Sequence, residues 1–283
     1  MGIATAWKAN KALRMQRNGN YQEAIKLYEE AIAEGMNDPR FLMPYALLII
    51  RDGQYQKARE FLVAHQKVPM SPGQRTEMLV YYATCCFRLG NTDKGISTLE
   101  QQFRKTETGL LYQTLGYLYV DKYDRDHRPD FEAMKAAEAP AEETAEEATE
   151  APAEETAEAE GGEAAPLSPE EEWNAGIEKA EAFIRQSVEY DEEDSICLDN
   201  LGEFLYRVRG DKAAAKEWFD KAIAIKENQI DTLYFLSRYD LDANDPKAAL
   251  EKLEKAAAGR FSPLNYSSRE MIEKEIEQLK GAL

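Results

Sequence analysis

The feature that most constrains this chain is a repeat with a period of about 34 residues. The segment GNYQEAIKLYEEAI at 19–32 aligns with GQYQKAREFLVAHQ at 53–66, at an offset of 34 residues. Near the C-terminus, GDKAAAKEWFDKAI at 210–223 and NDPKAALEKLEKAA at 244–257 have the same offset, and GNTDKGISTLEQQF at 90–103 is a fifth such segment. A period of this length indicates a repeat protein, in which each unit buries its apolar face against its neighbours.

Each segment carries a small residue followed four positions later by a large one. The pairs are Ala24–Tyr28, Ala58–Leu62, Gly95–Leu99, Ala215–Phe219 and Ala249–Leu253. This spacing puts both residues on one helical face, where the small one admits a neighbouring helix and the large one fills the gap beside it. A second apolar stripe precedes each turn, so pairs of helices are expected.

The repeat resembles that of the tetratricopeptide-repeat family. YQTLGYLY at 112–119 is similar to the W-x2-L-G-x2-Y pattern of that family's first helix, and Gly210, Ala215, Phe219 and Ala222 match its second. The resemblance is to bacterial-type cytoplasmic members. It implies an all-α, right-handed superhelical solenoid of antiparallel helix pairs, with about six repeats and a capping helix near 267–279. Departures include His65 and Gln102, which stand where the family has its last Ala.

An acidic tract interrupts the repeat. Of the formal net charge of −18, the stretch from 131 to 168 contributes 12 Glu against one Lys. Such a tract has little apolar surface to bury and repels itself, which predicts disorder. The expected organisation is repeats 1–3 and the first helix of repeat 4 at 1–128, the disordered insert at 129–167, and the second helix of repeat 4, repeats 5–6 and the capping helix at 168–283.

Regular structure is expected to return at SPEEEW. Ser168 has the place of a helix N-cap, and Glu171 three residues later completes a capping box. The helix that follows has its own small-to-large step, Ala180–Ile184, so we expect it to pair with the helix at 110–122 in one continuous solenoid. The alternative is two separate repeat domains on a flexible tether.

Composition excludes several classes of function. The three cysteines and two histidines match no disulfide framework or metal-ligand spacing, and no catalytic or phosphate-binding motif is present. We therefore expect no enzyme activity, no cofactor and no metal. An acidic surface disfavours nucleic acid, and the sequence has no apolar run of about 18 residues to span a membrane. A cytoplasmic location is expected.

The resemblance implies that a protein or peptide segment binds in the concave groove formed by the first helices. Transferred onto this sequence, the groove positions are Tyr81, Thr84, Arg88, Gln113, Thr114, Tyr117, Asn200, Glu203, Arg207, Tyr234, Phe235 and Arg238. The expected function is that of an interaction adaptor or scaffold. The alternatives are an acidic chaperone, whose Glu-rich insert shields a basic client, and a structural subunit of a larger assembly. Self-association is left open.

Overall fold

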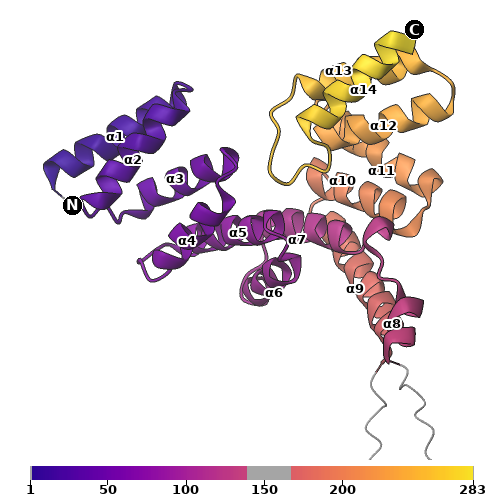
Figure 1. Cartoon of the computed structure of the whole chain (residues 1–283), viewed down its shortest axis with the longest axis horizontal. Helices are drawn as coiled ribbons and strands as arrows, with labels where there is room; N and C mark the ends of the chain where they lie inside the picture. Colours follow the sequence, from indigo (N-terminus) through magenta and orange to yellow (C-terminus); the bar gives the residue numbers. More distant parts are fainter. Residues whose placement is uncertain (1, 139–166, 283) are drawn as a thin grey trace, which may run out of the picture.

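The computed structural model describes residues 2–138 and 167–282, and all regular structure within them is helical. Six pairs of helices follow one another along the chain (Figure 1). The first helices of the pairs are α1 (Ile3–Arg17), α3 (Pro39–Arg51), α5 (Pro72–Arg88), α7 (Gly109–Lys122), α10 (Ser195–Glu203) and α12 (Ile230–Asp242). The second helices are α2 (Tyr21–Ala33), α4 (Tyr55–Ala64), α6 (Thr92–Phe103), α9 (Pro169–Tyr190), α11 (Lys212–Ile225) and α13 (Pro246–Ala257). The expected all-α solenoid is confirmed.

Each first helix packs against its own second helix and against the first helix of the next pair. The series runs from α1 through α3, α5, α7 and α10 to α12. Figure 1 shows that the stack curves, so that α1–α3 and α12–α14 stand at its two ends and α5 and α7 form the floor between them. None of the described helices has the length and apolar character needed to cross a membrane.

The small-to-large pairs form the contacts between helices, as the sequence predicts. The five large members of these pairs have side chains no more than 1% exposed. At Gly95, where the pattern departs from Ala, a Cβ atom would lie 3.1 Å from the backbone oxygen of Ala83. The close approach of α5 therefore favours glycine over alanine at this position.

Helix α9 packs against α7 and α10, which is the place of the second helix of the fourth repeat. Its N-terminus has the expected capping box between Ser168 and Glu171. Phe183 lies in a cluster of aromatic rings, with centroids 5.3 Å from Tyr112 and 5.1 Å from Phe103. These contacts support the proposal that the six repeats form one continuous stack rather than two tethered domains.

The expected start of the disordered insert at residue 129 is wrong. Residues Phe131–Glu138 form helix α8, and the Phe131 side chain is 5% exposed. Its ring lies edge-on to Trp173 of α9, at a centroid distance of 6.3 Å, because α9 offers an apolar surface at this point. The rest of the predicted disorder falls on 139–166, outside the described residues.

The C-terminal segment closes the stack in two steps. Residues 258–268 leave α13 as an irregular loop, and α14 (Arg269–Ala282) then packs against α13. In Figure 1 this loop descends on the inner side of the curve, toward α10. The predicted capping helix is thus present, and the loop before it lies on the surface where a partner is expected to bind.

Gly202→Ala should destabilise the fold, because a Cβ atom there would lie 2.7 Å from the ring of Phe219, which is fully buried. Overpacking of this kind costs about 1–3 kcal/mol in the free energy of unfolding, measured by urea denaturation. The matched control is Gly73→Ala, where a Cβ atom meets nothing within 4 Å. Equal stability of the two variants would contradict the packing described here.

Candidate functional site

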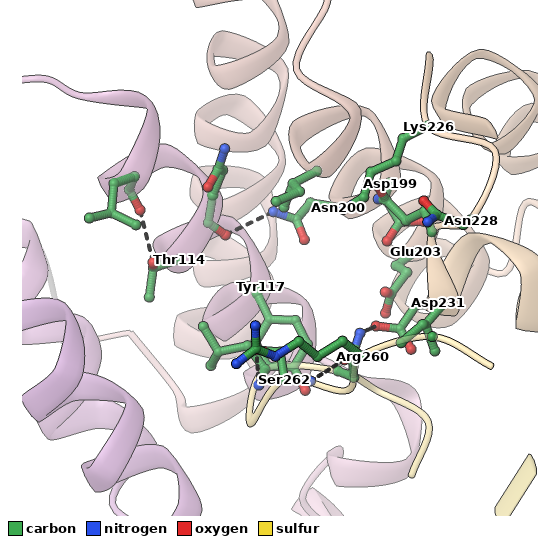
Figure 2. Close-up of a pocket in the computed structure, with 18 of the residues that line it drawn as sticks. Thr114, Tyr117, Asp199, Asn200, Glu203, Lys226, Asn228, Asp231, Arg260 and Ser262 are labelled. Atoms are coloured by element: carbon green, nitrogen blue, oxygen red, sulfur yellow. Dashed lines mark hydrogen bonds between the residues drawn. The ribbon is translucent and has the colours of Figure 1, made fainter. Parts of the chain in front are cut away.

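A cavity of about 400 Å³ opens on the inner side of the curve, between α7, α10, the start of α12 and the loop at 259–265. We call it the concave cavity. Figure 2 shows Thr114 and Tyr117 of α7 on one side of it and Asp199, Glu203 and Asp231 on the other. Residues Arg260 and Ser262 of the loop close it from below in this view.

Five of the twelve predicted groove residues line this cavity: Gln113, Thr114, Tyr117, Asn200 and Glu203. The close approach of α7 and α10 brings them together. Asn200 Nδ2 donates a hydrogen bond of 2.9 Å to the backbone oxygen of Gln113. A Cβ atom on Gly116 would lie 2.7 Å from that nitrogen. The glycine of the Leu-Gly pair in the repeat pattern therefore leaves the space that Asn200 occupies.

Below the cavity, the buried guanidinium of Arg207 joins two parts of the chain. Its Nη1 atom donates to Glu203 Oε2 at 2.6 Å and its Nε atom to Asp124 Oδ2 at 2.7 Å. Arg207 lies in a π-helical segment, Phe204–Arg209, that continues α10. The guanidinium of Arg125 donates to the backbone oxygens of Tyr206 and Arg207 and so satisfies acceptors at the end of this segment.

Three buried carboxylates stand close together on the wall of the cavity. Asp199, Glu203 and Asp231 are at most 5% exposed, and each has an oxygen within 4.8 Å of the other two. Burial raises the pKa of Asp199 to about 7, with a further increase from the charge of Asp231. Burial also raises the pKa of Glu203 and of Asp231. Ionisation of this carboxyl cluster is therefore disfavoured unless a cation lies close to it.

Asp231 fixes the loop that closes the cavity. Its carboxylate accepts hydrogen bonds from Asn265 Nδ2 at 2.7 Å, from the backbone nitrogens of Tyr266 and Ser267, and from the Ser267 hydroxyl at 2.7 Å. The ring of Tyr266 in turn lies 4.1 Å from the guanidinium carbon of Arg207. The loop is thus held to α12 and α10 by named polar contacts.

Three of the seven predicted residues that do not line the cavity lie on α5. Tyr81 is half-buried in a shallow hollow between α1, α3 and α5, and its hydroxyl donates to Glu77 at 2.5 Å. Arg88 is exposed, with its guanidinium 5.4 Å from the ring of Tyr55. Thr84 is buried, and its hydroxyl donates to the backbone oxygen of Val80 in its own helix.

The prediction that Phe235 contacts a partner is wrong, because Phe235 is a core residue. Its ring is 2% exposed and stacks on Phe219 at 5.2 Å. Tyr234 and Arg238 contact Glu275 of α14, through a hydrogen bond and an ion pair, respectively. The loop at 258–268 and the capping helix α14 therefore cover the groove positions of the sixth repeat. In the fifth repeat, the guanidinium of Arg207 is paired with Glu203 and Asp124 inside the fold.

Asp199 and Asp231 are site residues that the sequence reasoning missed. A signal was present: Asp199, Glu203 and Arg207 recur at intervals of four in an otherwise apolar stretch, which places three charges on one face of a buried helix. Asp231 is the second residue of α12 and gives no such signal, because its partners come from the loop some 34 residues later.

Comparison with known proteins agrees with this geometry. The sequence model of subunit 3 of the anaphase-promoting complex, or cyclosome, matches residues 17–102, and no curated protein matches the chain in sequence. The matched region spans the first repeats, and the helix pairs continue beyond it. The chain has the fold of a helix-pair solenoid, and its first repeats are similar to this family model.

Solved structures superpose on this chain at low identity. The type IV pilus biogenesis factor PilW has a TM-score of 0.57 and 14% identity, over 98% of this chain and 100% of PilW. The human IFIT1 dimer with m7Gppp-AAAA has a TM-score of 0.58 and 15% identity, over 96% of this chain and 54% of IFIT1. MamA of Desulfovibrio magneticus RS-1 has a TM-score of 0.51 and 16% identity, over 81% and 98%. These likenesses show the fold.

Asp199→Asn should remove a dependence of stability on pH. Asp199 has a pKa of about 7 in the fold and about 3.9 when unfolded, so its contribution to stability falls as pH rises from about 4 to 7. Above pH 7 the ionised carboxylate is buried near Asp231 and Glu203, and Lys226 offsets this only in part. We expect the variant to be more stable than wild type at pH 8 by roughly 2–4 kcal/mol and equal to it near pH 4.

Urea denaturation of both proteins at several pH values checks this expectation. Glu251→Gln, which also removes one carboxylate but at an exposed position of α13, is the control and should follow wild type. A stability difference between Asp199→Asn and wild type that does not change with pH would contradict the burial of an ionisable cluster.

Proposed function

We propose that this chain is a protein-interaction adaptor that binds an extended segment of a partner protein along the inner side of the curve. The bound segment lies over α5 and α7 and reaches the concave cavity. The observation that carries the proposal is the convergence of five groove residues, from two repeats, around one cavity on that face. Support from the fold is general, because helix-pair solenoids present extended concave surfaces to their partners.

Apolar side chains at the rim of the cavity support the same proposal. Leu110 and Ile196 line the cavity and are 40% and 36% exposed. Burial of such side chains contributes about 25 cal/mol per Å² of apolar surface. Side chains of a partner segment that cover Leu110 and Ile196 would therefore stabilise the complex.

The position of the segment follows from what is already covered. The loop at 258–268 and α14 occupy the groove positions of the last repeat, as the contacts of Tyr234 and Arg238 show. Groove positions of the third repeat, such as Tyr81 and Arg88, keep accessible surface. The acidic-chaperone alternative depends on the insert, which lies largely outside the described residues, so no contact favours it. A cytoplasmic location, a bacterial type and the exclusion of nucleic acid stay predictions.

Leu110→Asp should abolish partner binding and leave the fold intact. Leu110 lies in the first turn of α7, where a carboxylate is favourable at the helix N-terminus, so little stability is lost. In the complex the same carboxylate would be desolvated against the partner, which should weaken binding at least tenfold. The measurement is affinity purification from lysate of the source cells, followed by titration calorimetry with each recovered protein.

Ile3→Asp is the matched control. It makes the equivalent change in the first turn of α1, at a side chain that is 93% exposed and does not line the cavity. A partner that binds wild type and Ile3→Asp equally but is lost with Leu110→Asp supports the proposal. Equal binding to all three proteins would contradict it.

A further inference from the structure

The inner wall of the concave cavity carries more buried carboxyl groups than the one buried cation beside it can pair with. Asp199, Glu203 and Asp231 are 5%, 1% and 4% exposed. Arg207 contacts this group through Glu203, but its Nε atom already pairs with Asp124. One guanidinium is thus shared between Glu203 and Asp124, while Asp199 and Asp231 accept hydrogen bonds from neutral donors.

Two further cations line the cavity, Lys226 and Arg260, and both are exposed. Water screens charges at such positions, so each contributes little at the depth of the carboxylates. Their place at the rim leaves the interior acidic. A cationic group that reaches the interior is attracted by the carboxylates more strongly than it is repelled by Lys226 and Arg260. Attraction between buried charges is screened least by water.

Two nearly buried residues offer hydrogen-bond acceptors to the interior that nothing in the described chain uses. Asn200 is 2% exposed, and its Nδ2 atom is taken by the backbone oxygen of Gln113. Its Oδ1 atom makes no hydrogen bond to a described residue and points toward the space between Tyr117 and Glu203 (Figure 2). The Tyr117 hydroxyl, on a residue 6% exposed, is also without a described partner. Because every fully buried polar side-chain atom of the described residues has a partner, these two oxygens are open to the cavity, where a ligand that donates hydrogen bonds can reach them.

The existing hydrogen bonds distinguish an organic cation from a metal ion. Asp231 already accepts four hydrogen bonds from the loop, Asp199 accepts one from Thr232, and Glu203 one from Arg207. A metal ion that coordinated all three carboxylates directly would compete with the four hydrogen bonds that Asp231 accepts from the loop. An ammonium or guanidinium group can instead donate to the remaining lone pairs and to Asn200.

We propose that the concave cavity receives one lysine or arginine side chain of the partner segment. The charge of that side chain is met by Asp199, Glu203 and Asp231, and an N–H group donates to Asn200 Oδ1. Its aliphatic part packs on Leu110 at the rim. This inference rests on the proposed function, because it states which part of a bound segment the cavity recognises.

A phage-displayed library of random 12-residue peptides, selected against the full chain, tests the inference. Enriched peptides should share a basic residue. Replacing that residue by Gln should weaken binding to wild type at least tenfold and to Asp199→Asn less than threefold, because the second protein lacks part of the counter-charge. Glu251→Gln, which removes one exposed carboxylate, should behave as wild type.

Tyr117→Phe provides a second variant that keeps the packing of the ring. It should weaken the basic peptide two- to fivefold and leave its Gln form unchanged. Equal losses on wild type and Asp199→Asn, or enriched peptides that need no basic residue, would overturn the inference. If such peptides are still lost with Leu110→Asp, the adaptor proposal stands. Peptides insensitive to Leu110→Asp, or no enrichment at all, would contradict the adaptor proposal itself.

Discussion

The buried guanidinium of Arg207 connects three parts of the chain that are distant in sequence. It pairs with Glu203 in its own helix and with Asp124 in the loop after α7, and the ring of Tyr266 lies against it. Burying such a charge is costly, and removing one partner of a buried pair typically costs about 3–5 kcal/mol. The arrangement of α7, α10 and the C-terminal loop, and with it the shape of the concave cavity, depends on this group.

This network divides the inner side of the curve into two regions with different uses. Over the last repeat, the loop at 258–268 and α14 satisfy the groove residues from within the chain, and Asp231 holds the loop in place. Over α5 and α7 the surface stays accessible, and the cavity lies where the two regions meet. The same loop that closes the groove therefore forms one wall of the candidate site, opposite the helices that supply its apolar rim and acidic interior.

Local periodicity made the helix pairs predictable, and the capping box at Ser168 together with the step Ala180–Ile184 predicted where the repeat resumes after the insert. Contacts made by irregular segments produce no periodic pattern in the sequence and could not be predicted in this way. The groove assignment of Phe235 assumed an open last repeat, and the loop that covers it has no periodicity to reveal its path. Phe131 is a lone aromatic residue at the edge of a charged tract, so its burial against Trp173 depends on tertiary structure that composition does not encode.

The most direct test of the central claim is photo-crosslinking in the source cells from a benzoylphenylalanine placed at position 110, with position 225 of α11 as the comparison. Leu110 and Ile225 are similarly exposed, at 40% and 49%, but only Leu110 lines the concave cavity. The account predicts a defined protein crosslinked from position 110 and absent from position 225. Crosslinks from position 225 with none from position 110 would show that the partner binds elsewhere on the solenoid.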